Sequence, residues 1–260
     1  MEELRTWSVG TDGGIVTAAC PEPLRFVSGT RPEWMSRCSS AIRDALRELP
    51  IEDGTVLEAT LAGVPPQTAE LEDMLLYSVG IPETQVHAGV RLRRAPAVGP
   101  GVVQRYRRVP AATAAGEEAP LAAVHVPIAG VYEVESASSA WLVARRAVVA
   151  TLPPDGIAPP GGIELRIRLS TGTDRERGSI ELIKKLLDGI GDAFYAYAGA
   201  DLDETARALA MELKQGQDEM TMLLSSPRGA LLAGGERFGA ADVTIATGAR
   251  PQLEIELRAL

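Results

Sequence analysis

The sequence has no uninterrupted apolar run of the roughly 18 to 20 residues that a membrane-spanning helix requires. Its N-terminus, Met1-Glu2-Glu3, also lacks the basic region with which a signal peptide begins. We therefore expect a cytoplasmic protein that has no membrane partner.

Residues that bind soft metals or act as activated nucleophiles are scarce. The cysteines, Cys20 and Cys38, lack CxxC spacing, and the only histidines are His87 and His125. Neither histidine lies near a serine or cysteine in a recognised catalytic motif, and the sequence has no P-loop and no dinucleotide-binding glycine motif after a strand. This pattern argues against a zinc cluster and indicates two small buried thiols.

Lysine is rare, with three residues against 23 arginines, and the formal net charge is −9. Proteins that bind nucleic acid or anionic lipid through their whole surface are usually basic, so this balance argues against that mode of binding. One stretch departs from it, because positions 84–116 contain no Asp or Glu. The stretch contains six arginines: Arg91, Arg93, Arg94, Arg105, Arg107 and Arg108.

This arginine stretch is a candidate nucleic-acid-binding segment. The guanidinium group matches phosphate oxygens, and Tyr106 lies between two of the arginines, where it could stack on a base. The alternative is a solvated loop or a docking surface for an acidic partner, including the acidic region of this same chain at positions 201–236.

The remaining composition is that of a globular protein, since apolar residues make up 45% and charged residues 23% of the chain. Helical spacing of apolar residues predicts helices over 33–49, 70–79, 138–152, 179–195 and 202–213. Alternation predicts strands over 57–61, 85–92, 121–134, 163–169, 243–246 and 253–257. We therefore expect an α/β (α+β) fold in which helices pack on mixed sheets.

The predicted elements occur twice in the same order. Gly54 and the strand after it resemble Gly162 and the strand that follows, and Trp34 and Trp141 precede these glycines by 20 and 21 residues. Repeats about 110 residues apart indicate duplicated domains rather than a solenoid. Residues 96–120, with four prolines, predict a linker or long loop. We therefore expect one unit over 1–95 and a similar unit over 121–260, which together form a pseudo-dimer.

Each unit resembles the RusA family of Holliday-junction resolvases, small homodimers whose protomers run strand, helix, strand, helix, strand. The family motif Asp-x-Asp-Asn-Leu-Leu-Lys falls where residues 70–76 read Glu-Leu-Glu-Asp-Met-Leu-Leu, and Asp-Asp-x-Gln-Val falls where 82–86 read Pro-Glu-Thr-Gln-Val. The resemblance implies a Mg²⁺ site, with catalytic and metal-binding roles for Glu70, Glu72, Asp73 and Glu83. Two or three carboxylates on hard cations activate the water that hydrolyses a phosphodiester.

The chain departs from the family pattern in both units. Glutamates at 70, 72 and 83 stand where the family has aspartates, and a longer side chain disturbs a near-octahedral magnesium shell. In the second unit, the motif can be aligned either on Lys184 or by the offset between the repeats. Neither alignment places a pair of acidic residues at the motif positions, so that copy is expected to be inert. An alternative for the first unit is that its carboxylates simply favour a solvated helix N-terminus.

Two hypotheses follow, and the sequence leaves both open. The first is a nucleic-acid-directed protein, specifically a magnesium-dependent, structure-specific DNA endonuclease with one degenerate carboxylate site. The second is a non-catalytic interaction or assembly module on a decayed nuclease-like fold, which would have a protein partner. A small-molecule enzyme remains a third alternative, because a fold does not fix a function. The sequence sets neither the oligomeric state nor the substrate.

Overall fold

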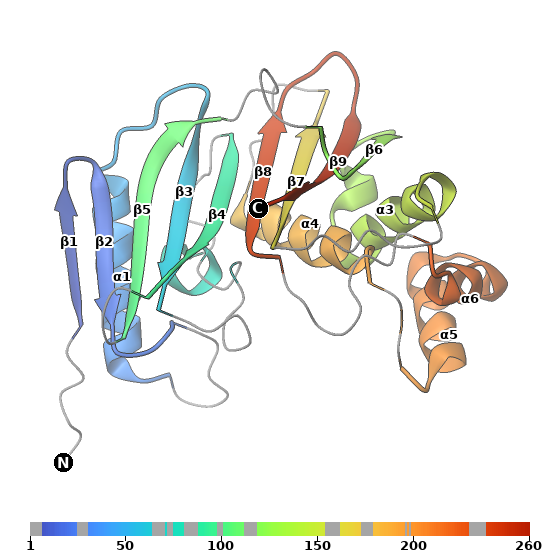
Figure 1. Ribbon diagram of the computed structural model, residues 1–260, viewed down its shortest axis with the longest axis horizontal. Helices are drawn as coiled ribbons and strands as arrows, with labels where there is room; N and C mark the ends of the chain where they lie inside the picture. The colour runs from blue at the N-terminus through green and yellow to red at the C-terminus, as the bar shows by residue number, and fades with distance from the viewer. Residues whose placement is uncertain are drawn as a thin grey trace. The chain divides into compact units, whose positions relative to one another are not determined.

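The structure is a computed structural model that describes residues 7–24, 31–63, 71, 75–80, 88–97, 101–111, 119–153, 162–172, 179–195, 197, 199–228 and 238–260. It confirms the predicted mixed α/β class (Figure 1). The chain divides into two compact units. The first comprises Met1–Glu117, Asp174–Ile183 and Gly239–Ala246, and the second comprises Glu118–Thr173, Lys184–Phe238 and Thr247–Leu260.

The described part of the first unit contains six strands, β1 (Ser8–Asp12), β2 (Ile15–Cys20), β3 (Thr55–Ala62), β4 (Gly89–Ala95), β5 (Val102–Pro110) and β8 (Ala240–Ala246). They lie in the order β1-β2-β5-β3-β4-β8. Only β3 and β4 pair in parallel, and the other four pairings are antiparallel.

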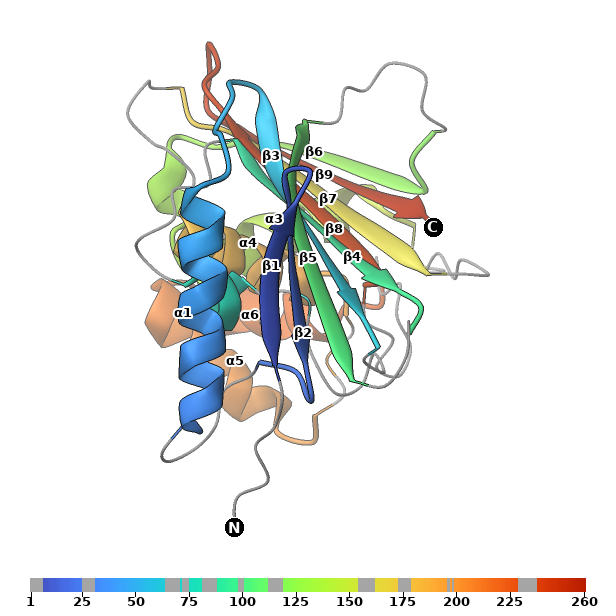
Figure 2. The same ribbon diagram turned by 90° about the vertical axis from the view of Figure 1, so that its left-hand side faces the viewer.

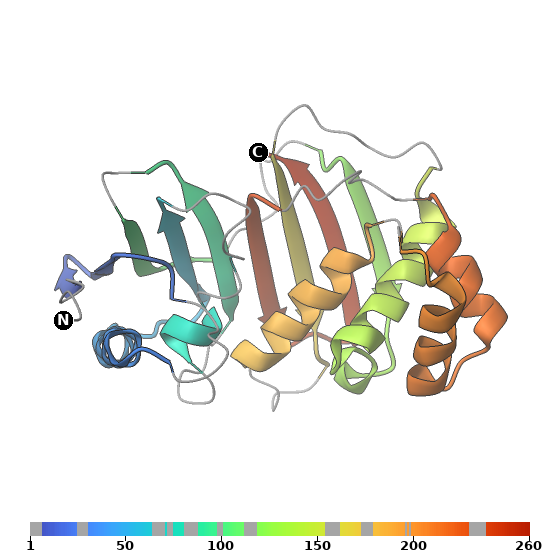
Figure 3. The ribbon, with the colours of Figure 1, turned by 90° about the horizontal axis from the view of Figure 1, so that it is seen from below.

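One face of this sheet is covered by helix α1 (Glu33–Arg47) and by the π-helical turn η1 (Leu75–Val79). Figures 2 and 3 show α1 alongside the strands, with η1 on the same side. Met35, Cys38, Ile42 and Leu46 recur every three or four residues along α1, and all four are buried. The alternating strand residues that point to α1 complete the core of the unit.

The second unit contains β6 (Ala122–Pro127), β7 (Ile163–Ser170) and β9 (Gln252–Ala259), which pair antiparallel in the order β7-β9-β6. Its helices are η2 (Val131–Val134), α3 (Ala137–Thr151), α5 (Leu202–Leu213), α6 (Gln217–Ser225) and most of α4 (Ile180–Asp192). Helix α3 begins at a capping box, in which Ser136 and Ser139 each bond the backbone N–H of the other. Figure 3 shows α3 to α6 on one side of these strands.

The expected linker over 96–120 is corrected by the structure, because Val102–Pro110 form β5 between β2 and β3. Val102, Gln104 and Tyr106 are buried on one face of β5, and of the two residues between them Val103 is partly exposed and Arg105 is exposed. The linker was predicted from the four prolines of 96–120, and none of these prolines lies inside β5, since Pro110 is its last residue. Strand β8, expected in the second unit, pairs with β4 of the first.

Candidate functional site

The four carboxylates of the predicted magnesium site lie outside the described residues: Glu70, Glu72, Asp73 and Glu83. The Mg²⁺ site therefore stays a prediction. Among the residues that are described, no three or more His, Cys, Asp or Glu side chains converge in a way that could hold a metal ion.

The arginine stretch divides between the two faces of the first-unit sheet. Arg91 and Arg93 of β4, with Arg105 and Arg107 of β5, alternate with buried residues that point to α1, so these four share the opposite face. Strand β3 lies between β4 and β5 and is paired with both. The four side chains, which we call the arginine face, therefore stand in two rows across three adjacent strands.

The first row of the arginine face is a ladder of alternating charge. Glu58 of β3 lies opposite both Arg107 and Arg91, and Arg91 lies opposite Asp242 of β8. Arg107 donates to Glu58 at 2.6 Å, Arg91 donates to Asp242 at 3.0 Å, and Arg91 and Arg93 approach Glu58 to 3.8 and 3.9 Å. The Glu58 and Asp242 side chains are 8% and 5% exposed. The guanidinium groups supply the opposite charge that a buried carboxylate requires.

The second row contains no carboxylate. Thr60 of β3 lies opposite Arg105 on one side and Arg93 on the other. Because β5 and β4 are two strand spacings apart, the backbones of Arg93 and Arg105 lie about 10 Å from each other. Two arginine side chains are long enough to contact the same anion across this distance. The Arg93 side chain is 40% exposed and Arg105 is exposed, so solvent reaches this row. Four arginines and two carboxylates leave the face with a net charge of two positive.

Three other predicted binding residues point to the helix-covered side. The Tyr106 ring is fully buried, and its hydroxyl donates to Gln104 Oε1 at 2.6 Å, so the ring has no face on which a base could stack. Arg94 and Arg108 also alternate away from the arginine face. Burial lowers the pKa of Arg108, and its Nε and Nη1 atoms are buried without a hydrogen-bond partner. These three residues do not belong to the arginine face.

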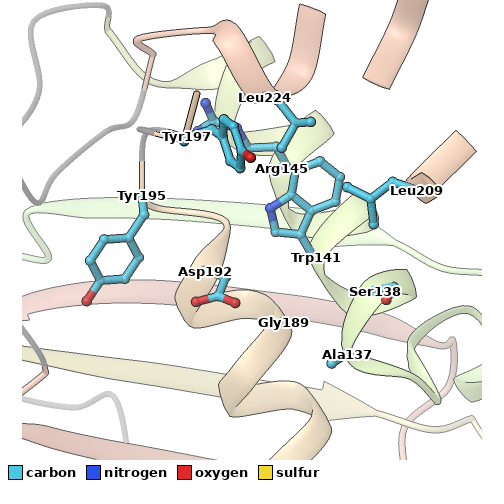
Figure 4. A pocket seen from close by; sticks show the side chains of 11 residues that line it. Ala137, Ser138, Trp141, Arg145, Gly189, Asp192, Tyr195, Tyr197, Leu209 and Leu224 are labelled. Carbon is cyan, nitrogen blue, oxygen red and sulfur yellow. The ribbon is translucent and has the colours of Figure 1, made fainter. Parts of the chain in front are cut away.

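The second unit holds a pocket of about 400 Å³, which lies within the size range of small-molecule sites (Figure 4). Its walls come from α3, the end of α4, the residues after α4, and the helices α5 and α6. Eleven of the described residues line it: Ala137, Ser138, Trp141, Arg145, Gly189, Asp192, Tyr195, Tyr197, Gly199, Leu209 and Leu224. Three aromatic rings and two leucines make the wall largely apolar, and Asp192 is exposed.

Arg145 holds the walls of this pocket together. The residue is 1% exposed and donates to four backbone oxygens, those of Ala193, Leu223, Ser226 and Arg228, at 2.5 to 3.0 Å. These carbonyls lie at or just beyond the C-terminal ends of α4 and α6, where helix dipoles favour a cation. Burial lowers the pKa of the guanidinium. Arg145 therefore fixes α3 to two other helices.

Two further contacts shape the pocket. Gly189 of α4 lies so close to α3 that a Cβ atom there would collide with Ala137 O and crowd Trp141 N. Tyr197 donates to Asp201 Oδ1 at 2.5 Å and lies 2.8 Å from Thr205 Oγ1, which ties the segment after α4 to the start of α5. That hydrogen bond to the carboxylate raises the pKa of Tyr197 and lowers that of Asp201.

Sequence reasoning did not find the pocket. It used Trp141 only to align the two repeats, and it singled out neither Tyr195 nor Tyr197. The pocket residues come from four separate segments, so no local spacing connects them. The cluster of five acidic residues and no basic residue over 186–206 is the one sequence signal that marks this region.

Comparison with known proteins gives no match: no family model, curated protein or solved structure is significantly similar to this chain. Within the described ranges, no helix combines the length and the apolar character needed to cross a membrane.

Proposed function

We propose that the first unit binds the phosphate backbone of a nucleic acid on its arginine face. The observation that carries the proposal is the row Arg105–Thr60–Arg93, in which two guanidinium groups flank a hydroxyl on the surface of a sheet. This row offers charged and neutral donors to the oxygens of one phosphate. The neighbouring Arg107, whose side chain is 53% exposed, extends the positive surface along β5.

Spacing supports a backbone ligand rather than a single small anion. Arg105 and Arg107 are two residues apart on one strand, so their Cα atoms lie about 7 Å from each other. That separation resembles the distance between successive phosphates of an extended single strand. Contacts to phosphate fix a protein on nucleic acid without reading its sequence. The expected activity is therefore sequence-independent binding that depends steeply on salt.

The negative charge of the whole chain limits the binding to this face. The net charge of −9 disfavours binding through the whole surface, so a small basic face orients the ligand as well as attracting it. Two free, buried cysteines agree with action in the reducing cytoplasm.

Cleavage is a separate proposal that depends on the predicted carboxylates Glu70, Glu72, Asp73 and Glu83. Its test is Mg²⁺- or Mn²⁺-dependent cleavage of branched, duplex and single-stranded DNA by the natural protein and by a Glu72→Gln, Glu83→Gln double variant. Cleavage that the two substitutions abolish supports a nuclease. If the natural protein leaves every substrate intact, the non-catalytic binding module is the remaining form of the proposal.

The binding proposal is tested by fluorescence anisotropy with a labelled single-stranded oligonucleotide at several salt concentrations. An Arg93→Gln, Arg105→Gln variant is expected to weaken binding and to reduce the slope of log K against log salt by about one for each phosphate that the variant no longer neutralises. The matched control is Arg166→Gln, Arg168→Gln on β7 of the second unit. The proposal fails if both double variants change the affinity equally, or if neither changes it.

A further inference from the structure

The pocket of the second unit carries an inference that is independent of the arginine face. We propose that this pocket binds a small aromatic amine in its protonated form. The proposal stands on three features of the described residues: the aromatic wall, the sign of the charge around the mouth, and the rigidity of the frame.

The wall matches an aromatic or cationic ligand. Trp141, Tyr195 and Tyr197 all line the cavity, and Leu209 and Leu224 add an apolar surface (Figure 4). An aromatic face attracts a cation electrostatically, and tryptophan does so most strongly. Trp141 lines the cavity with only 9% of its surface exposed, so a cation that contacts this open part of the ring would be largely removed from water, where the attraction is greatest.

The charge of the side chains at the pocket favours a cationic ligand over a neutral or anionic one. Asp192 is the acidic side chain among the described residues that line the pocket, and it is exposed, while Tyr197 in the wall bonds a second carboxylate, that of Asp201. A local excess of one charge raises the concentration of ligands of opposite sign. Arg145, the one basic residue in the wall, gives hydrogen bonds to four carbonyl oxygens behind it. Its charge is therefore balanced by the ends of α4 and α6.

The frame holds the wall in place before a ligand arrives. Arg145 connects α3 to the ends of α4 and α6, and the Tyr197–Asp201–Thr205 hydrogen bonds connect the segment after α4 to α5. A site whose side chains are already fixed loses little conformational entropy on binding. The volume of about 400 Å³ is enough for a one- or two-ring molecule but not for a folded partner.

The test uses three probes that share an indole ring: tryptamine, which is a cation, indole-3-ethanol, which is neutral, and indole-3-propionate, which is an anion. Each is titrated into ¹⁵N-labelled protein, and the indole N–H signal of Trp141 is followed by NMR. The chain has three tryptophans, so a Trp141→Phe variant assigns the signal. We expect tryptamine to shift the Trp141 signal and to bind about tenfold more tightly than the neutral probe, a difference of about 1.4 kcal/mol.

Asp192→Asn and Asp188→Asn form a matched pair of variants. Both remove one negative charge from α4, but Asp192 lines the pocket, whereas Asp188 lies one turn earlier and is not among the lining residues. Asp192→Asn is expected to remove most of the preference for tryptamine, and Asp188→Asn to retain it. Tighter binding of the anion, no shift of Trp141 with any probe, or an equal effect of the two variants would each overturn the proposal.

Discussion

The two units place strands in the same relative order but use them differently. In the first unit β5 lies between β2 and β3, and in the second β9 lies between β6 and β7, with every one of these pairings antiparallel. Helix α1 follows β2 in the first unit, and helix α3 follows β6 in the second. This agreement is what a duplicated unit would produce, although the duplication and the RusA resemblance remain predictions. The shared elements form a scaffold, so function is expected where the units differ.

The first difference is the charge on matching strand positions. When Gly54 is aligned with Gly162, Glu58 corresponds to Arg166 and Thr60 to Arg168. Opposite these residues, β5 places Arg107 and Arg105, whereas β9 places Glu256 and Glu254. The Glu58–Arg107 pair is therefore reversed in sign in the second unit, and the Thr60–Arg105 pair is replaced by an arginine–glutamate pair. The first-unit face is left with two positive charges, whereas three arginines and three glutamates make the matching face of the second unit neutral.

The second difference lies behind the sheet. Aligning Trp34 with Trp141 places Cys38 and Arg145 at the same position of their helices, and both are fully buried. Cys38 Sγ lies 3.5 Å from Cys20 Sγ of β2, whereas Arg145 reaches the ends of α4 and α6. Helices α5 and α6 have no counterpart among the described residues of the first unit. These two helices supply the outer wall of the pocket.

The largest expected effect comes from removing the four hydrogen bonds by which Arg145 connects α3 to α4 and α6, which we call the Arg145 clamp. Arg145→Met leaves four buried carbonyl oxygens without their charged donor, which we expect to lower the free energy of unfolding by about 3 to 5 kcal/mol. Urea unfolding measures the change. The control is Arg146→Met, at the next position, whose ion pair with Glu219 is partly exposed and is worth about 0 to 1 kcal/mol. Equal losses from the two variants would contradict the clamp.

Breaking the charge ladder is expected to have a smaller effect, with stability and affinity changing in opposite directions. Glu58→Gln deprives three neighbouring arginines of their carboxylate, so the free energy of unfolding falls by about 1 to 3 kcal/mol. The same change makes the arginine face more positive, so binding to an oligonucleotide tightens. Asp44→Asn changes the total charge equally on the exposed side of α1 and should affect neither quantity. Weaker binding by Glu58→Gln would show that the ladder positions the arginines.

Alkaline pH should destabilise the first unit through Tyr106. Burial raises the pKa of Tyr106 well above its ordinary value near 10, so above pH 10 the unfolded chain loses this proton while the folded chain retains it. The contribution to stability is complete below about pH 10, and about 1.4 kcal/mol is lost by pH 11. The free energy of unfolding is measured at pH 9 and pH 11 for the natural protein and for Tyr106→Phe. The variant should lack this loss. The exposed Tyr132→Phe variant serves as control, and an identical pH dependence in both would refute the assignment.

The smallest effect is expected at Cys38, the position that corresponds to Arg145. Cys38→Ala removes one buried sulfur and its contact with Cys20, at a cost of about 1 kcal/mol. The same urea titration gives the value. A loss in the free energy of unfolding as large as that of Arg145→Met would mean that the two positions contribute equally to stability. The proposed difference between α1 and α3 would then be wrong.

The sequence predicted most elements whose apolar spacing was regular, such as α1, α3, α5 and β7. It did not predict β5, because Arg105 and Arg107 replace the apolar residues that a two-sided strand would show, nor the pairing of β8 with β4, which no local pattern encodes. The arginines were found from their charge, but their division between two faces depends on register. Buried Tyr106 shows this most clearly, since its neighbours on both sides are exposed.

The most direct test of the account exchanges the charge of the two faces and measures oligonucleotide binding. Arg105→Gln with Arg107→Gln makes the first-unit face neutral, and Glu254→Gln with Glu256→Gln gives the second-unit face the net charge of two positive that the first has in the natural protein. We predict that the first pair abolishes binding at low salt and that the second pair adds a binding site. Binding that persists in the first variant, with no additional site in the second, would contradict the claim that these matching strand positions decide where nucleic acid binds.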